Sequence, residues 1–470
     1  MRNAGKIKRF YRGTNFEKFD EPHYFMPQPK GIAFFLISFL ALVNAYSQPA
    51  DTTKRIDSLI TALHERGQFN GAIIVSMAGK TIYRNAIGKT NTNEQFVPTT
   101  QSDIASLSKG FTAMAVMMLA EQGKLTYDDL IIKYLPELRG FSNGITIRHL
   151  LTHTSGIPDV GDLGIDNPQL TNAKALKTLM KLKSNFREPG QKYQYSNTGY
   201  LLLATIVERI TGKPFSNFLN EKILEPLEMK NTMLSGLTVG MGGIQSTIDD
   251  LLKWTESFDK EKLVQQSTLD EAFKPFLVKE GTSTYGFGWN IVLKDGDKFI
   301  WHTGNTEGFR AFIGRWLSEK IAVIILTAGD SKRMEINDAI INILHGRPFA
   351  LPKMPIVDKL YDRIIKGGIE KGIAYYDSLK NQDFRNYDFS EPQLNSLGYR
   401  LLNEKKSKEA IELFKLNTIA YPESSNAFDS LGEAYYKTGD IATAIKCYET
   451  ALKLDPGNLS SISMLKKIKK

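Results

Sequence analysis

The chain of 470 residues contains a single cysteine, Cys447, and this scarcity excludes several kinds of chemistry. One thiol cannot form an internal disulfide, and Cys447 is predicted to be a small packing residue in a helix. Six histidines occur, but none stands in an H-E-x-x-H pattern. His149 and His153 are four residues apart in a predicted loop that offers no third ligand nearby. We therefore expect neither a metal site nor a cofactor.

A strong excess of charge of one sign is also missing. The formal net charge is +9, and residues 1–47 supply +4 of it through seven Lys and Arg against three Asp and Glu. The remaining excess of +5 is mild, and no basic stripe alternates with aromatic residues. We therefore expect no nucleic-acid partner. A hydrophobic content of 42% and a charged content of 24% are typical of a globular protein, and the length suggests two or three domains.

The N-terminal apolar stretch from Gly31 to Val43 is too short to span a bilayer comfortably. A lysine precedes it, and small residues follow at positions 45 and 47, which is typical of a secretory signal cleaved after Ser47. Residues 1–47 therefore predict export to the periplasm or the medium, with translation starting at Met1 or Met26. The alternative is a membrane-anchoring helix, so membrane contact is expected only through this segment if it stays uncleaved. No cysteine is near enough to carry a lipid.

What the sequence does contain is the tetrad Ser106-Leu107-Ser108-Lys109, which opens an apolar run that ends at Ala120. The run is rich in Ala, Met and Leu, so the tetrad is predicted to lie in the first turns of a helix. Residues three apart share a helical face, which places the Ser106 hydroxyl beside the Lys109 ammonium. A buried lysine with a lowered pKa can accept the serine proton. Without further partners, however, the two residues would be interpreted as solvated neighbours.

The first downstream partner is the triplet Tyr195-Ser196-Asn197, which precedes a predicted helix at 199–210. A nearby lysine cation would lower the pKa of the Tyr195 phenol enough for proton exchange with Ser106. Asn197 would orient Lys109 and hydrogen-bond a substrate carbonyl or amide. The alternative is a loop tyrosine followed by a helix N-capping asparagine.

The second downstream motif is His302-Thr303-Gly304 on a predicted strand. A glycine there would let a substrate backbone approach and pair along the strand edge. The N–H groups of Asn305 and Ser106 are candidates for an oxyanion hole. The alternative for His302 is a satisfied strand histidine.

The strand and helix patterns predict an α+β fold. Two strands form a hairpin at 69–77 and 81–87, a long helical region follows at about 124–280, and strands return at 285–293, 299–303, 308–316 and 321–328. Helices are predicted at 48–68 and about 334–344. This order favours an antiparallel sheet covered by helices, with a cleft beside an all-α lobe.

The three motifs, Ser106-x-x-Lys109, Tyr195-x-Asn197 and His302-Thr303-Gly304, resemble the signatures of the serine β-lactamase and penicillin-binding-protein superfamily. The Tyr-x-Asn form is similar to its class C branch, with its related esterases and peptidases. The loop at 149–158 and the stretches at 241–254 and 285–289 are also typical of that branch, so the resemblance covers roughly residues 53 to 345.

The resemblance implies acyl transfer, in which Ser106 attacks a carbonyl, Lys109 and Tyr195 move the proton, and water releases the acyl-enzyme. The expected catalytic residues are Ser106, Lys109 and Tyr195, and the expected substrate-binding residues are Asn197, His302, Thr303, Gly304 and Asn305. One position departs from the pattern, because the third motif often begins with lysine. A histidine with an ordinary pKa near 6.5 is largely neutral at pH 7, which should weaken carboxylate-bearing substrates more than neutral esters or interior amides.

The C-terminal part contains an internal repeat of 34 residues. Leu397-Gly398 recurs as Leu431-Gly432, and an alanine, an aromatic residue and a proline recur at the same offset. The pattern resembles the tetratricopeptide repeat. We predict a hydrolase domain at 48–345, a linker with a helix (364–379) at 346–390, two repeats at 391–458 and a C-terminal helix at 459–470. The repeats either cap the enzyme or bind a peptide or protein partner.

The leading hypothesis from the sequence is an exported serine hydrolase acting on an ester or amide bond of a small molecule, a peptide or a peptidoglycan fragment. Two alternatives remain open. One is a penicillin- or peptide-binding protein with little turnover, whose repeats mediate a protein interaction. The other is a true β-lactamase.

Overall fold

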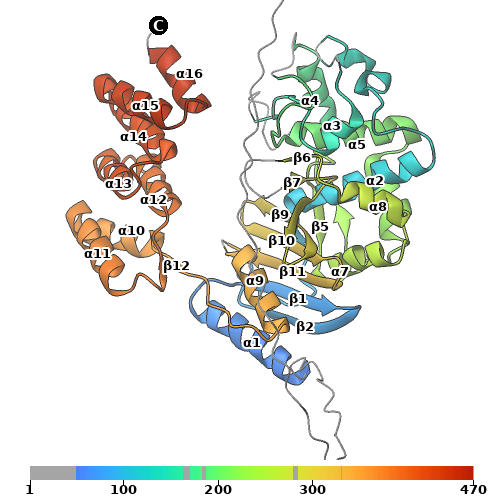
Figure 1. The fold of residues 1–470 in the computed structure, drawn as a ribbon, viewed down its shortest axis with the longest axis horizontal. Coiled ribbons are helices and arrows are strands. Elements are labelled where there is room, and N and C mark those ends of the chain that lie inside the picture. The colour runs from blue at the N-terminus through green and yellow to red at the C-terminus, as the bar shows by residue number, and fades with distance from the viewer. Residues whose placement is uncertain are drawn as a thin grey trace, which may run out of the picture. The chain divides into compact units, whose positions relative to one another are not determined.

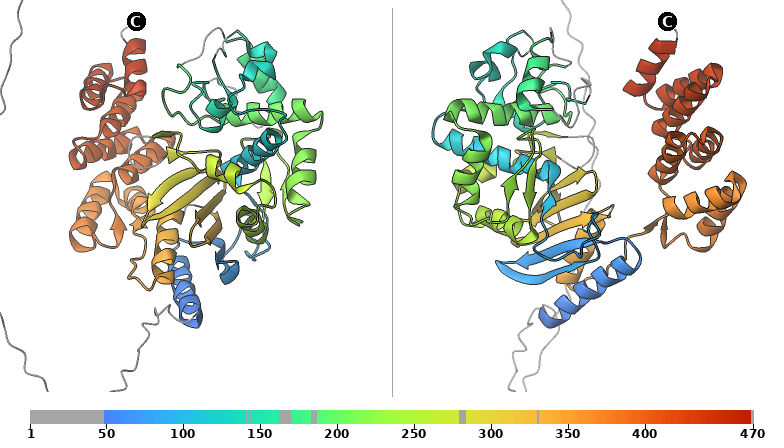
Figure 2. Two further views of the ribbon diagram at one scale, coloured as in Figure 1. Left: turned by 45° about the vertical axis from the view of Figure 1, so that its right-hand side comes forward. Right: turned by 180° about the vertical axis from the view of Figure 1, so that it is seen from behind.

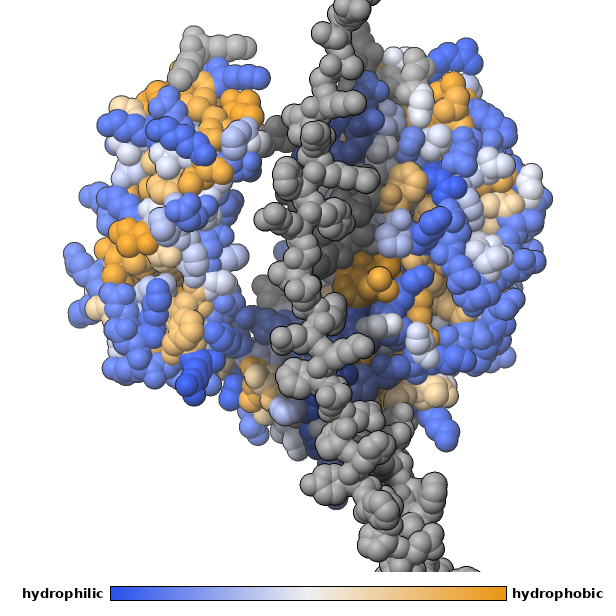
Figure 3. Space-filling view, in the orientation of Figure 1, coloured by the Kyte–Doolittle hydropathy of each residue, from blue (hydrophilic) through white to orange (hydrophobic). Residues whose placement is uncertain are grey.

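The computed structural model describes residues 49–468 other than 141, 143, 162–169, 183–186, 279–283 and 330. The predicted signal segment, residues 1–47, lies outside the described residues. Within the described ranges, no helix is both long enough and apolar enough to cross a membrane. Figure 3 shows that the described surface on one face is mostly hydrophilic, with apolar residues in small separate groups.

Eight strands form one antiparallel sheet in the order β2-β1-β11-β10-β9-β8-β7-β6 (Figure 1). Its strands are β1 (Gly71–Met77), β2 (Lys80–Ile87), β6 (Leu277–Val278), β7 (Thr284–Tyr285), β8 (Asn290–Lys294), β9 (Asp297–Thr306), β10 (Phe309–Trp316) and β11 (Ile321–Ala328). The predicted hairpin is confirmed, and Ala78 and Gly79 turn it with positive φ angles of 49° and 77°. Strand β1 also pairs with β11, where Ile73 faces Ile325, so the first and last strands of the chain to join this sheet lie side by side in it, next to its β2 edge.

One predicted strand is wrong. The segment at 285–293 is divided into β7 and β8, with a loop between them. Gly288 in this loop has a φ of 82°, and a Cβ atom there would lie 3.0 Å from the Gly110 Cα. Glycine therefore lets the chain turn tightly against the start of helix α2.

Helices cover both faces of the sheet, which confirms the predicted α+β class (Figure 2). On one face, α1 (Pro49–Glu65) and α9 (Arg333–Leu344) bury Ile60 and Ile340 with Phe312 of the sheet. On the other face, the core includes residues of α2 (Ser108–Glu121), α5 (Asn197–Thr211) and α7 (Ile248–Glu256). Eleven of the fourteen residues of α2 are buried, and Phe111 stacks on Trp254 of α7 with ring centroids 4.1 Å apart. Helix α2 is therefore a core helix.

The region between the two groups of strands is mainly helical, as predicted. Its further helices of five residues or more are α3 (Ile147–Leu151), α4 (Asn172–Leu179), α6 (Phe215–Leu219), a π-helical turn (Asn220–Leu224) and α8 (Gln266–Ala272). A small second sheet joins β3 (Ser102–Asp103), β5 (Ile244–Ser246) and β4 (Met233–Leu234).

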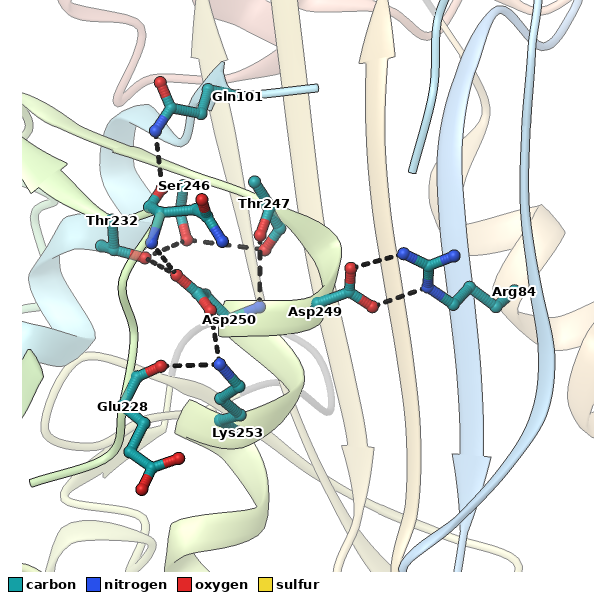
Figure 4. A network of polar contacts seen from close by, with 10 residues as sticks. Arg84, Gln101, Glu228, Thr232, Ser246, Thr247, Asp249, Asp250 and Lys253 are labelled. Carbon is teal, nitrogen blue, oxygen red and sulfur yellow. Dashed lines mark hydrogen bonds and ion pairs between the residues drawn. The ribbon is translucent and has the colours of Figure 1, made fainter. Parts of the chain in front are cut away.

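A polar network beside this small sheet links it to α7 (Figure 4). The buried Asp250 carboxylate accepts hydrogen bonds from the Asn231 N–H at 2.7 Å and the Thr232 hydroxyl at 3.0 Å. Arg84 of β2 makes two hydrogen bonds of 2.7 Å to the Asp249 carboxylate. A bidentate pair of this kind fixes orientation as well as distance. The contacts of Asp249 and Asp250 therefore hold α7 against both sheets, close to β3, the strand that leads to Ser106.

Seven helices make up most of the C-terminal part of the described chain. They are α10 (Val357–Gly367), α11 (Ile369–Gln382), α12 (Glu391–Asn403), α13 (Ser407–Ala420), α14 (Ser425–Thr438), α15 (Ile441–Leu454) and α16 (Leu459–Ile468). Two short strands, β12 (Met354–Pro355) and β13 (Tyr387–Asp388), pair in parallel. The predicted single helix at 364–379 is wrong, because Gly368, with a φ of 86°, separates α10 from α11.

The repeated glycines have a packing role in the two helix pairs α12–α13 and α14–α15. A Cβ atom at Gly398 would lie 2.6 Å from the Phe414 ring, and one at Gly432 would lie 3.0 Å from the Tyr448 ring. Each glycine therefore lets an aromatic ring of the second helix pack against the first. Residues of α10 share a core with α12, and Leu465 of α16 packs with Tyr448, so helices cover both ends of the repeat pair.

Candidate active site

A short 3-10 turn, Ala105–Leu107, places Ser106 just before α2. The predicted helical start is therefore displaced by two residues, since Ser106 lies in the 3-10 turn and Lys109 in the first turn of α2. Ala105 has a φ of 48°, and its N–H donates to the Asp103 carboxylate at 2.7 Å. A non-glycine residue in this left-handed region is strained, and such strain is common at functional sites.

Lys109 lies against the Ser106 hydroxyl, with 3.0 Å between Nζ and Oγ. Its ammonium also donates to the Asn197 side-chain oxygen at 2.8 Å and to the Met241 carbonyl at 3.0 Å. The side chain is completely buried, so the alternative of solvated neighbours is wrong. Burial lowers the pKa of Lys109 from 10.5 to about 7, and the Asp159 carboxylate opposes this shift in part. A large fraction of Lys109 is therefore neutral at pH 7.

Tyr195 donates its hydroxyl hydrogen bond to the Ser106 Oγ at 3.0 Å. Its ring lies 4.9 Å from the Lys109 Nζ. The expected lowering of its pKa is wrong, because burial of the phenol raises the pKa well above its ordinary value of 10. Tyr195 is therefore a neutral hydrogen-bond donor at pH 7, which leaves Lys109 as the group able to accept the serine proton.

Asn197 is the first residue of α5, and Ser196 occupies the N-cap position, so the capping alternative for Asn197 is wrong. The Asn197 side chain accepts the hydrogen bond from Lys109, while its backbone N–H donates to the Asp159 carboxylate. Asp159 was missed in the sequence. The available signal was an acidic residue directly after the stretch at 149–158. The structure corrects the prediction of a loop there, because residues 149–151 belong to α3.

His153 is a second residue missed by the sequence, where only its failure as a metal ligand was considered. It is buried with a φ of 55°, and its Nδ1 accepts the Ser196 N–H at 3.1 Å. Its ring centroid lies 4.3 Å from that of Tyr195 and 4.6 Å from that of Tyr285. Burial lowers its pKa well below 6.5, so a neutral imidazole supports the Tyr195 ring and the backbone that follows it.

His302 is buried on β9, and both of its ring nitrogens have partners. Its Nδ1 lies 2.7 Å from the Thr303 carbonyl, and its Nε2 lies 3.0 Å from the Tyr285 hydroxyl. The carbonyl can only accept, so Nδ1 carries the hydrogen and Nε2 accepts from Tyr285. Burial and the nearby Lys109 lower the pKa of His302 to about 3, so the expected neutrality holds while the expected ordinary pKa is wrong. This geometry agrees with the alternative of a strand histidine whose two ring nitrogens both have hydrogen-bond partners within the protein.

The rest of the third motif lies on β9 beyond the point where the described residues of β8 pair with it. Strand β8 pairs with β9 only as far as Trp301, so β9 is an inner strand whose end beyond Trp301 has no β8 partner. A Cβ atom at Gly304 would lie 2.0 Å from the Ile104 carbonyl oxygen. Gly304 is therefore required for the turn that carries Ser106 to approach β9. Thr303 is partly exposed and Asn305 exposed, and their contacts with substrate stay predictions.

The arrangement brings together the three expected catalytic side chains and Asn197. Strand β9 lies against the turn that carries Ser106. It provides a nucleophile, a base of suitable pKa and a neutral acid within hydrogen-bond reach, which are the groups required for acyl transfer. In the described part of the chain, no three His, Cys, Asp or Glu residues are grouped as a metal ion would require.

Comparison with known proteins places the fold among penicillin-binding proteins and their relatives. Over 359 residues the chain is 28% identical to penicillin-binding protein 4* of Bacillus subtilis, a similarity that covers 64% of this chain and 78% of that protein. The octameric penicillin-binding protein homologue from Pyrococcus abyssi is 25% identical with a TM-score of 0.57, covering 67% of this chain and 81% of that one. A β-lactamase/D-alanine carboxypeptidase from Yersinia pestis, 24% identical, has the same fold with a TM-score of 0.55, covering 64% of this chain and 99% of that one.

The family assignment follows from two matched segments. Residues 425–458 match the tetratricopeptide repeat, which coincides with the helix pair α14–α15. Residues 56–345, more than half of the chain, match the family described as Beta-lactamase. The chain therefore belongs to the beta-lactamase family and carries a tetratricopeptide-repeat segment after that domain.

Proposed function

We propose that the protein is an exported serine hydrolase that cleaves an ester or amide bond through an acyl-enzyme on Ser106. The observation that carries the proposal is the 3.0 Å contact between Ser106 Oγ and a buried lysine whose pKa is about 7. Serine becomes a good nucleophile only when a neighbouring group accepts its proton, and neutral Lys109 is placed to do so. Membership of a family that includes penicillin-binding relatives supports the same chemistry.

In the proposed mechanism, Ser106 Oγ attacks the substrate carbonyl as its proton moves to Lys109. The N–H groups of Ser106 and Asn305 stabilise the oxyanion. Collapse of the tetrahedral intermediate breaks the bond to the leaving group, which takes a proton from the Tyr195 hydroxyl, and the Lys109 ammonium returns a proton to Tyr195. Water then attacks the acyl-enzyme as Lys109 again accepts a proton. The bond between the acyl carbon and Ser106 Oγ breaks, Ser106 Oγ takes the proton back from Lys109, and the acid is released.

The charges at the site favour a neutral substrate. His302 stands where a lysine is common in the family, and its pKa of about 3 leaves it uncharged throughout the physiological range. Tyr193 and Tyr285 contribute further aromatic rings near His153, with centroids 6.0 Å and 4.6 Å from that of His153. We therefore expect neutral esters and interior amides to be better substrates than compounds with a carboxylate beside the cleaved bond, including β-lactams.

The test compares the purified protein with Ser106→Ala on p-nitrophenyl esters, D-amino-acid peptides and a chromogenic cephalosporin. A matched control is Ser108→Ala, because the Ser108 hydroxyl is buried with no hydrogen-bond partner among the described residues. We expect turnover and fluorophosphonate labelling to be lost only in Ser106→Ala. Equal turnover by the wild type and Ser106→Ala on every substrate would show that Ser106 is not the nucleophile.

Export is tested by cell fractionation of the full chain and of a chain lacking residues 1–47. We expect the full chain outside the cytoplasm and the shortened chain inside it. If both chains are found in the same cell fractions, the proposal of export is wrong, whereas the proposed hydrolysis through Ser106 is not affected.

A second candidate function, binding of a protein partner, is favoured by the match to the tetratricopeptide repeat. If binding is the main activity, a partner recovered with the wild type should also be recovered with Ser106→Ala. If the partner is lost when α14–α15 is altered while ester turnover persists, binding and hydrolysis are separate functions of the chain.

A further inference from the structure

Arg333, the first residue of α9, makes three hydrogen bonds to the end of strand β9 and its neighbour. Its Nη2 donates to the Asn305 side-chain oxygen at 2.8 Å. Its Nη1 donates to the Gly304 carbonyl at 3.1 Å and to the Ala311 carbonyl of β10 at 3.2 Å. One guanidinium therefore contacts both residues of the peptide group between Gly304 and Asn305.

The guanidinium approaches β9 from the face opposite to Ser106. A Cβ atom at Gly304 would point at Ile104, in the segment that leads to Ser106. Side chains alternate along a strand, so the Asn305 side chain points to the other face, where α9 lies. Arg333 therefore reaches the peptide from behind and does not occupy the space in front of the serine.

The strand register gives the direction of this peptide group. Thr306 pairs with Phe309 across a two-residue turn, and such a turn is closed by a hydrogen-bonded pair. Hydrogen-bonded and non-bonded pairs alternate in an antiparallel ladder. The Asn305–Arg310 pair is therefore non-bonded, which directs the Asn305 N–H away from β10 towards the opposite edge of β9. The Gly304 carbonyl, at the other end of the same peptide group, points to β10.

We propose that Arg333 is a positioning residue, which holds and polarises the Gly304–Asn305 peptide so that its N–H can stabilise the oxyanion. The inference rests on the proposed function, because it concerns the same reaction. A charged donor on the carbonyl withdraws electron density from the peptide and makes its N–H a stronger donor. The contact with the Asn305 side chain fixes the residue that carries this N–H.

The test uses the full chain with Arg333→Gln and Arg333→Lys, and with Arg310→Gln as a matched control. Arg310 lies on the same hairpin but donates to the carbonyls of Thr306 and Phe309. Loss of a whole oxyanion donor lowers kcat by about 10²–10³. Arg333→Gln keeps the Asn305 N–H and removes only the guanidinium that holds it, so kcat should fall by about tenfold. KM should stay within about twofold, and the affinity for a boronic acid that mimics the tetrahedral intermediate should fall in parallel with kcat.

Arg333→Lys keeps one charged donor and should lose about threefold in kcat, which keeps the inference testable if Arg333→Gln fails to fold. Wild-type kcat and boronic-acid affinity in both Arg333 variants would overturn the inference and leave the proposed function intact. An equal loss in Arg310→Gln would also overturn it, because general damage to the hairpin would then explain the effect. Absence of Ser106-dependent turnover in the wild type would overturn the proposed function, and the inference with it.

Discussion

Lys109 at the start of α2 and His302 on β9 are both buried bases of one site, and burial lowers the pKa of each. The consequence differs because their ordinary values differ. Lys109 falls from 10.5 to about 7, which leaves it able to gain and lose a proton at neutral pH. His302 falls from 6.5 to about 3 and stays neutral. The same physical cause thus leaves one group able to exchange a proton at neutral pH and the other uncharged.

The partners of the two groups fit these roles. The Lys109 ammonium has three acceptors, the Ser106 hydroxyl, the Asn197 oxygen and the Met241 carbonyl, so its charged form is tolerated despite burial. The His302 ring accepts a hydrogen bond from the Tyr285 hydroxyl and donates one to the Thr303 carbonyl. Only the neutral ring has one nitrogen that accepts and one that donates. Protonating His302 would place a cation near Lys109 and displace the Tyr285 hydrogen bond.

The largest expected effect is that of Lys109→Met, which removes the base and keeps an unbranched side chain of similar length. General-base catalysis contributes about 10²–10⁴ in rate, so we expect kcat/KM on a neutral ester to fall by about 10³. Steady-state kinetics on purified protein provide the measurement. Lys124→Met, an exposed lysine shortly after α2, is the control and should keep full activity. A loss of less than about tenfold in Lys109→Met would contradict the role of Lys109 as the base.

Tyr195→Phe should have the next largest effect. The variant keeps the ring that packs on His153 and removes the hydroxyl that donates to Ser106. We expect about a 10²-fold loss on amides and a smaller loss on p-nitrophenyl esters, because nitrophenolate leaves without protonation. Tyr193→Phe, which alters a neighbouring tyrosine, is the control and should change the turnover of either substrate by no more than about twofold. Equal losses of Tyr195→Phe on amides and esters would rule out Tyr195 as the acid for the leaving group.

His302→Lys should have the smallest effect on overall rate and the clearest effect on substrate choice. The introduced ammonium would supply the point charge that His302 lacks, so the preference for carboxylate-bearing over neutral substrates should rise about three- to tenfold. Competition between a neutral ester and its carboxylate-bearing analogue measures this ratio. His64→Lys on α1 controls for an added lysine elsewhere. An unchanged ratio would mean that residue 302 does not set the charge preference.

The sequence predicted the elements and the spacing of the site better than its electrostatics. Ser106 and Lys109 were predicted to lie side by side from their spacing, because helical geometry alone brings residues three apart together. The sign of the Tyr195 pKa shift was predicted wrongly, because burial of the phenol raises its pKa by more than the hydrogen bond with Ser106 lowers it. His153 and Asp159 were missed because they act through the backbone of residues 196 and 197, about 40 positions away in the chain.

The two wrongly predicted elements were broken by glycines for different reasons. The strand at 285–293 is interrupted because Gly288 packs against Gly110, a contact between segments far apart in the sequence. The helix at 364–379 is divided at Gly368, where the local sequence did contain a signal in the pair Gly367-Gly368. Local patterns therefore predicted the types of element, a tertiary contact determined the break in the strand, and a local glycine pair marks the break in the helix.

The most direct test of the account is the pH dependence of Ser106 acylation, measured with a neutral fluorophosphonate or ester under single-turnover conditions. Acylation requires neutral Lys109, and burial lowers the pKa of this lysine to about 7, so the rate should be low near pH 5, rise through an inflection near pH 7 and level off by about pH 9. His302, with a pKa of about 3, should add no second inflection in this range. A rate that is independent of pH between 5 and 9, or that rises only near the ordinary lysine pKa of 10.5, would contradict the assignment of Lys109 as the base.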